Sequence, residues 1–90
     1  MSSTAKTVLI TNRRGLHARA SAKFVTLASE QTAEVHVCKD GPSVVGTSIM
    51  GLMMLGAAMG DHITISSDGD GAETAVIALA ALVEAKFGEE

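Results

Sequence analysis

Apolar and polar residues alternate in three short stretches of the chain, and each stretch predicts a β-strand. Residues 7–11 (TVLIT) are rich in β-branched side chains, and residues 33–39 and 62–66 carry valine or isoleucine at alternate positions. In the second stretch Val35 and Val37 are expected to face a core, while the residues between them face solvent.

A β-hairpin is predicted directly after the second stretch. Asp40-Gly41 is a strong turn signal, and a short strand over residues 43–45 can follow it. Pro42 has no backbone N–H to donate to a strand ladder, so we expect this last strand to lie at the edge of a sheet.

The spacing of apolar residues changes to that of a helix over residues 18–29. Apolar side chains recur there at intervals of one helical turn, and charged residues lie largely off this stripe. The stripe consists of Ala20, Phe24, Leu27 and Ala28. A second, short helix is expected to begin at a cap on Thr47 or Ser48 and to end near Leu55.

A third helix is expected near the end of the chain, after a loop over residues 67–71. Asp70 and Glu73 stand three positions apart, as in a capping box that opens a helix. This helix is expected to bury five residues: Ala72, Val76, Leu79, Val83 and Phe87.

The resulting order of elements is βαββαβα, in one domain over residues 1–90. Strands that alternate with amphipathic helices in this way favour a single sheet with helices on one face. The periodicity by itself does not determine the order of the strands in that sheet.

Composition narrows the class of function. Seven basic and ten acidic residues give a formal net charge of −3, which provides no electrostatic footprint for nucleic acid or an anionic membrane. The longest apolar stretch, residues 49–60, is well below the roughly 20 residues needed to span a bilayer. Cys38 is the sole cysteine, which excludes an internal disulfide. With no signal-peptide pattern at the N-terminus, a cytoplasmic protein is expected.

The segment Gly15-Leu16-His17 carries the candidate chemistry. Gly15 allows a sharp turn, and the helical spacing begins just after His17, which places the imidazole at or beside the helix N-cap. The first N–H groups of a helix have no partner within the helix, and they favour an anion. A phosphoryl group on His17 would therefore meet backbone donors, including those of Ala18 and Ala20.

Histidine suits the transient carriage of phosphate. Its neutral imidazole is a nucleophile near neutral pH and can release the group again. Arg19 could bind phosphoryl oxygens, and Arg14 could add charge from the loop. No Asp or Glu lies near His17 in the sequence to act as a base, and this chemistry needs neither a metal nor a cofactor. The alternative is that His17 only caps a helix and Arg19 is a solvated charge.

The short helix predicts a second candidate region. If Leu52 and Leu55 face the core, then an exposed apolar patch with adaptable side chains is formed by Ile49, Met50 and Met53. The alternative is that these are ordinary core residues. Ser48 is expected to cap this helix, and it could also accept a regulatory phosphate there.

Other candidate sites are weaker. His36, Cys38 and His62 could in principle bind zinc, but we expect them to be solvent-facing sheet residues instead. The sequence Asp68-Gly-Asp70-Gly lacks the remaining ligands of a calcium loop. The glycines form no nucleotide-binding pattern.

Two segments resemble the HPr family, the histidine phosphocarriers of the bacterial phosphoenolpyruvate-dependent phosphotransferase system. Residues 15–22 (GLHARASA) resemble its active-site motif, and residues 47–56 (TSIMGLMMLG) with 60–65 (GDHITI) resemble its second signature. The resemblance covers the chain from about Lys6 to Phe87. It implies an α+β fold called the open-faced β-sandwich, an antiparallel sheet of four strands in order 1-4-2-3 covered on one face by three helices.

The resemblance also implies roles for individual residues. His17 would be phosphorylated on Nδ1 by enzyme I and would pass the group to an enzyme IIA, with Arg19 as the active-site arginine. Ser48 matches a serine that a dedicated kinase modifies in some bacteria, where a phosphorylase can reverse the modification. The protein would be a stoichiometric carrier rather than an enzyme, and we expect it to be a monomer.

Two positions depart from the common family pattern. Ala20 stands where many members have proline, and Arg14 stands where sugar-transport members often have asparagine. Both features are closer to the nitrogen-related branch. Two other classes stay open: a regulatory binding module that uses the Met50 patch, with phosphorylation only as a switch, and a small metal-binding domain, although the latter lacks paired cysteines.

Overall fold

A computed structural model describes residues 3–89 of the chain. Within that range the order βαββαβα is confirmed, and a one-turn segment follows the last helix. The elements are β1 (Ser3–Leu9), α1 (Ala18–Ser29), β2 (Val35–Cys38), β3 (Ser43–Val45), α2 (Ile49–Met54), β4 (His62–Asp68), α3 (Ala72–Glu84) and η1 (Lys86–Gly88).

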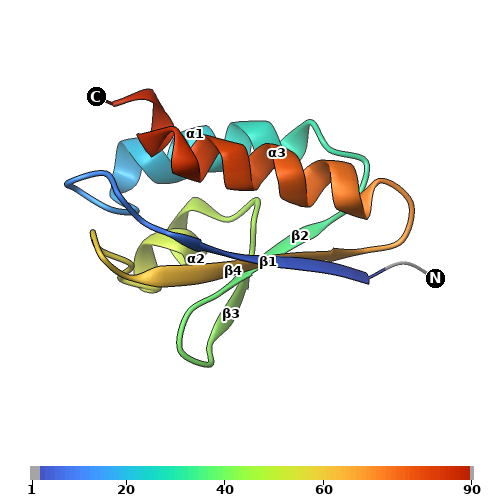
Figure 1. The fold of residues 1–90 in the computed structure, drawn as a ribbon, viewed down its shortest axis with the longest axis horizontal. Coiled ribbons are helices and arrows are strands. Elements are labelled where there is room, and N and C mark those ends of the chain that lie inside the picture. The colour runs from blue at the N-terminus through green and yellow to red at the C-terminus, as the bar shows by residue number, and fades with distance from the viewer. Residues whose placement is uncertain (1–2, 90) are drawn as a thin grey trace.

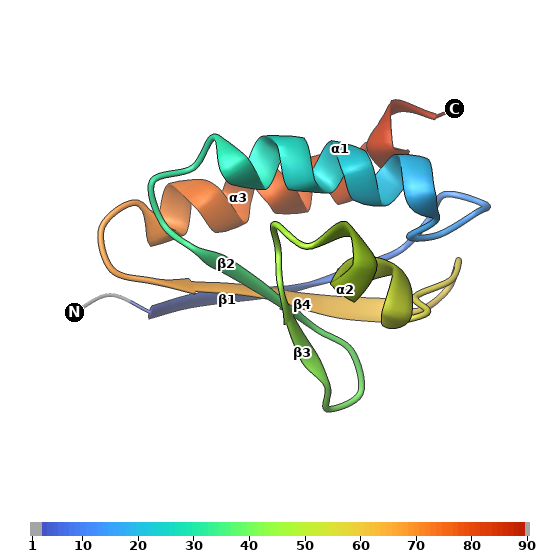
Figure 2. The same cartoon turned by 180° about the vertical axis from the view of Figure 1, so that it is seen from behind.

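The four strands form one antiparallel sheet in the order β1-β4-β2-β3. Helices α1 and α3 lie side by side over one face of this sheet (Figure 1). Seen from behind, α2 lies beside the N-terminal half of α1 (Figure 2). This architecture confirms the fold class implied by the resemblance, and β3 lies at the sheet edge as Pro42 predicts.

The core lies between the sheet and the helices. Phe24 at the middle of the α1 stripe is fully buried, and Val35 and Val37 are buried from the sheet side, as predicted. Burying a side chain of this kind contributes about 1.5–3 kcal/mol to folding. The sequence pattern predicted the extent of α1, from Ala18 to about Ser29, because its apolar stripe and its polar face are both complete.

Both long strands extend beyond the predicted segments. β1 begins at Ser3 rather than Thr7 and ends at Leu9, and β4 continues through Asp68, so the predicted loop begins two residues too early. The reason is that β1 and β4 pair with each other over seven positions, from Ser3–Asp68 to Leu9–His62. Backbone ladder bonds form whether or not side chains alternate, so polar residues can continue a strand. β2 is shorter than predicted, spanning four residues.

The start of α3 is not a capping box. Gly71 occupies the N-cap with φ of 84°, and no side chain caps this helix end. A Cβ at Gly71 would lie 2.2 Å from the Thr32 hydroxyl oxygen, which can rotate away, so the left-handed backbone is what favours glycine here.

Phe87 is buried as predicted, but it is not part of α3. The helix ends at Glu84, and Phe87 reaches the core from η1, where its own φ is 55°. Since a left-handed residue cannot continue an α-helix, α3 ends before this point, and the C-terminal segment lies near the start of α1 (Figure 1).

Candidate functional site

His17 occupies the N-cap of α1, as the sequence predicts. Its backbone is extended (φ −72°, ψ 179°), and its carbonyl accepts the first helical hydrogen bond from Ser21 N–H at 2.8 Å. The N–H groups of Ala18, Arg19 and Ala20 therefore precede the first internal bond of the helix. These groups are available to an anion that approaches the helix end.

The turn before His17 is held by hydrogen bonds on both sides. Gly15 N–H donates to the Asn12 carbonyl at 3.2 Å, and the Asn12 side-chain amide donates to the Gly15 carbonyl at 2.9 Å. Leu16 N–H donates to the carbonyl of Ala57, in the loop after α2, at 3.0 Å. The position of His17 is thus tied to the segment that follows α2.

A carboxylate contacts the His17 ring, although none lies near it in the sequence. Glu89, 72 positions away, bonds to His17 Nε2 through Oε2, and its Oε1 accepts a hydrogen bond from Asn12 Nδ2 at 3.1 Å. The His17 and Glu89 side chains are 14% and 15% exposed. The sequence offers only a weak indication of this contact: Glu89 is an acidic residue that follows shortly after Phe87, which is predicted to be buried.

The Glu89 carboxyl is ionised more readily than usual. Partial burial raises its pKa, but hydrogen bonds from His17 and Asn12 and the positive charges of His17 and Lys23 outweigh burial, so the pKa lies below its ordinary value of 4.5. At neutral pH Glu89 is therefore a carboxylate that accepts hydrogen bonds and donates none.

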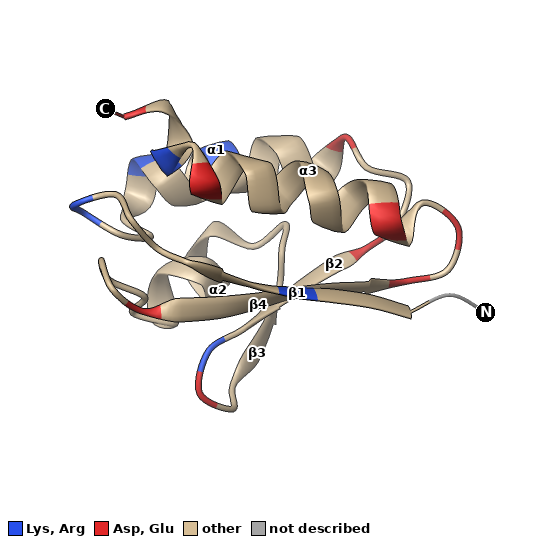
Figure 3. Ribbon diagram, viewed as in Figure 1, with Lys and Arg blue, Asp and Glu red and all other residues tan. Residues whose placement is uncertain are grey.

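Basic residues gather around this contact. Arg13, Arg14, Arg19 and Lys23 line a shallow hollow together with Gly88 and Glu89. Figure 3 shows several Lys and Arg positions, in blue, at the end of the molecule where α1 begins. Neither Arg14 nor Arg19 forms an ion pair with a residue in the described range, so both are available to an anionic group at His17.

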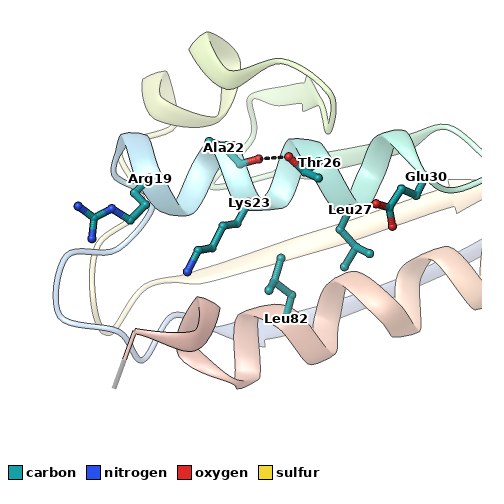
Figure 4. A pocket seen from close by; sticks show the side chains of 7 residues that line it. All are labelled: Arg19, Ala22, Lys23, Thr26, Leu27, Glu30 and Leu82. Carbon is teal, nitrogen blue, oxygen red and sulfur yellow. Dashed lines mark hydrogen bonds between the residues drawn. The ribbon is translucent and has the colours of Figure 1, made fainter.

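A groove between α1 and α3 adjoins the basic hollow and shares two of its residues. Figure 4 shows Arg19 and Lys23 at one end of it and Leu27 and Leu82 further along. The full lining is Arg19, Ala22, Lys23, Thr26, Leu27, Glu30 and Leu82. Sequence periodicity did not predict this groove because it forms only where two helices meet.

The α2 region has the exposed apolar face that the sequence predicts. Leu52 is fully buried, whereas Ile49, Met50 and Met53 are 42%, 71% and 43% exposed. The Ser48 hydroxyl caps the helix by accepting a hydrogen bond from Gly51 N–H at 2.9 Å. Met54, which is not among the residues predicted for this face, is also exposed.

The three candidate zinc ligands lie apart from this region. His36 and Cys38 are half-buried on β2, and His62 is exposed at the start of β4. Cys38 Sγ donates weakly to the Gly41 carbonyl. Among residues 3–89, no three such side chains are arranged to hold a metal ion, and no helix there is long and apolar enough to cross a membrane.

Comparison of the sequence with models of known protein families shows which family the chain belongs to. A family model described as the "PTS HPr component phosphorylation site" matches residues 4–85. The chain belongs to the HPr family. The resemblance of the two sequence segments to HPr is thereby confirmed, and the βαββαβα sandwich is the HPr fold.

Relatives named HPr and relatives named NPr both match the chain. The phosphocarrier protein HPr of Cupriavidus necator is 45% identical over 80 residues, covering 89% of this chain and 90% of the relative. The phosphocarrier protein NPr of Shewanella violacea is 42% identical over 89 residues, covering 99% of this chain and 98% of the relative. The crystal structure of HPr-C-His from Thermoanaerobacter tengcongensis matches with a TM-score of 0.91 at 45% identity, covering 97% of this chain and 98% of that one.

Proposed function

We propose that His17 accepts a phosphoryl group from phosphorylated enzyme I and passes it to an enzyme IIA. The observation that carries this proposal is that His17 lies at the N-cap of α1, with Arg19 in the first turn of the same helix. Within residues 3–89, Arg19 forms no ion pair with another side chain. The imidazole supplies the nucleophile, and the N–H groups of Ala18 and Ala20 with the guanidinium of Arg19 receive the phosphoryl oxygens. Arg14 adds positive charge from the preceding loop.

The α2 surface supports docking of the two partner proteins. A carrier must present one surface to a donor and then to an acceptor, and methionine side chains can repack against both. Ile49, Met50 and Met53 are exposed on the helix that packs beside α1. A serine kinase acting on Ser48 would add negative charge at the edge of this surface.

Incubation with enzyme I and labelled phosphoenolpyruvate tests the acceptor. The wild type is expected to gain an acid-labile phosphoryl group, and His17→Ala is expected to gain none while its circular dichroism spectrum is unchanged. His62→Ala is the matched control, because His62 is exposed on β4 and should not affect labelling. Undiminished labelling of His17→Ala would overturn the assignment and direct attention to His36 or His62.

A second candidate function is a regulatory binding module that uses the Met50 surface, with the phosphate on His17 only as a switch. The 71% exposure of Met50 favours it, since so large an exposed apolar side chain suits partner binding. Purified phosphoprotein distinguishes the two functions when it is mixed with sugar-type and nitrogen-type enzymes IIA. Transfer of label to either supports the carrier and identifies its branch, whereas binding to partners without any transfer supports the module.

A further inference from the structure

We propose that Glu89 is a positioning residue for phosphoryl transfer through His17. Its carboxylate holds the imidazole with the proton on Nε2, which leaves Nδ1 as the nucleophile, and it stabilises the positive charge that the ring acquires on transfer. This inference rests on the proposed role of His17 as phosphoryl acceptor.

The hydrogen bond between the two side chains determines which ring nitrogen is free. Glu89 Oε2 contacts His17 Nε2, and an ionised carboxylate can only accept a hydrogen bond. In the neutral ring the proton must therefore stay on Nε2. His17 Nδ1 makes no hydrogen bond to any residue between 3 and 89, so its lone pair is available to an electrophile.

The carboxylate is anchored independently of His17. Asn12 is fully buried, and its side-chain amide donates both to Glu89 Oε1 and to the Gly15 carbonyl. The residue that shapes the turn before His17 therefore also orients the group that contacts its ring. A carboxylate held at both oxygens fixes the plane and direction of the imidazole more strongly than a single contact would.

The backbone before Glu89 adopts an uncommon conformation that returns it to this position. Lys86 and Phe87, neither of them glycine, have φ of 57° and 55°, and Gly88 has φ of 74°. Such residues persist only where their surroundings hold them, and they gather at functional sites. Here burial of the Phe87 ring and a 2.8 Å hydrogen bond from Lys23 Nζ to the Phe87 carbonyl hold the turn.

The transfer step shows what the carboxylate contributes. The Nδ1 lone pair attacks the phosphorus of the phosphoryl group on enzyme I, forming the new N–P bond. The bond between that phosphorus and the donor atom of enzyme I breaks, and its electron pair stays with the donor atom. Because Nε2 keeps its proton, the His17 ring now carries a positive charge. Glu89 faces that charge, as a buried aspartate does in hydrolase triads.

Two substitutions test orientation and charge. Glu89→Ala removes the whole contact, whereas Glu89→Gln removes the charge and keeps one acceptor oxygen, so it can accept from His17 Nε2 or from Asn12 Nδ2 but not from both. Glu34→Gln is the matched control, because Glu34 is an exposed acidic residue that directly precedes β2. Each protein is measured in two ways: by ¹⁵N spectra of the imidazole without any donor, and by the rate of phosphoryl transfer from phosphorylated enzyme I at saturating concentration.

The expected spectra show a single Nε2–H form in the wild type and in Glu34→Gln, and a mixture of the two forms in Glu89→Ala. Transfer to Glu89→Ala is expected to be about tenfold slower, with unchanged affinity for enzyme I, and transfer to Glu89→Gln should be intermediate. Identical spectra and rates in Glu89→Ala and wild type would overturn the inference. Faster transfer to Glu89→Ala would also overturn the inference, since it would show that Glu89 blocks access to the His17 ring and does not assist transfer. Absence of label from His17 in every protein would instead refute the proposed function, and the spectra would still report on Glu89.

Discussion

The carbonyl oxygen of Ala57 occupies space that any side chain on Gly15 would need. A Cβ at Gly15 would lie 2.3 Å from that oxygen, and the same oxygen accepts the hydrogen bond from Leu16 N–H. Gly15 also has φ of 64°, in the region that favours glycine. The loop that carries His17 and the loop that follows α2 are therefore packed backbone to backbone, which fixes the candidate acceptor relative to the α2 surface.

Gly15→Ala is expected to lower the free energy of unfolding by about 3 kcal/mol, because the new methyl group collides with backbone that cannot move aside. Gly69→Ala is the control: its φ is 83°, but nothing lies within 4 Å of a Cβ there, so it should lose only about 1 kcal/mol. Urea denaturation measures both. Equal losses would show that the Ala57 contact can relax.

Arg19→Ala is expected to slow phosphoryl transfer to His17 about tenfold, because a charged hydrogen-bond donor to the phosphoryl oxygens is lost. Its free energy of unfolding should change by less than about 0.5 kcal/mol, since the side chain is exposed. Lys6→Ala removes the same charge from β1, where Lys6 pairs with Glu84, and should leave the rate unchanged. A rate loss shared by both variants would indicate a general charge effect.

Ser48→Asp is expected to slow transfer from enzyme I with an unchanged circular dichroism spectrum. Aspartate caps a helix as well as serine does, while its charge disfavours docking at the adjacent apolar surface. Ser48→Ala should do the reverse: it loses the cap to Gly51 N–H, costing about 1 kcal/mol of stability, and keeps the transfer rate. Rapid transfer to Ser48→Asp at low salt would contradict the proposed docking role.

Met50→Ala is expected to weaken binding of enzyme I several-fold without destabilising the fold, because Met50 is 71% exposed. Ile77→Ala is its control: Ile77 is 57% exposed on α3 and lies outside the proposed docking surface. The affinity is measured by titration calorimetry, at an interface that we expect to bury less than about 1,200 Å². Equal affinities of Met50→Ala and Ile77→Ala for enzyme I would show that α2 is not part of the docking surface.

The contact between Glu89 and His17 is expected to persist into the acid range. Since the pKa of Glu89 in the folded protein lies below its ordinary value of 4.5, its contribution to stability is fully present above about pH 4.5. That contribution is lost as the pH falls through the lowered pKa. Titration of the Glu89 side-chain carboxyl by ¹³C NMR measures it directly. A midpoint at or above 4.5 would show that burial outweighs the hydrogen bonds from His17 and Asn12.

The sequence alone determined the features that depend on local periodicity. The bounds of α1, the burial of Phe24 and the exposure of Met50 follow from which side of a helix each residue occupies. The place of His17 at a helix N-cap is equally local, because it depends on where the helical spacing begins. The strand ends were less predictable, since pairing of β1 with β4 extends through serine and threonine positions that show no apolar alternation.

Only the tertiary structure determined what surrounds the His17 ring. Glu89 reaches His17 across 72 positions because the chain reverses through a left-handed turn at Lys86 and Phe87, two residue types that carry no local signal for that conformation. The turn is held by contacts from α1 and the core, which exist only after α3 has packed. A pattern along the chain can therefore identify the nucleophile, but the carboxylate beside it is selected by packing between segments far apart in sequence.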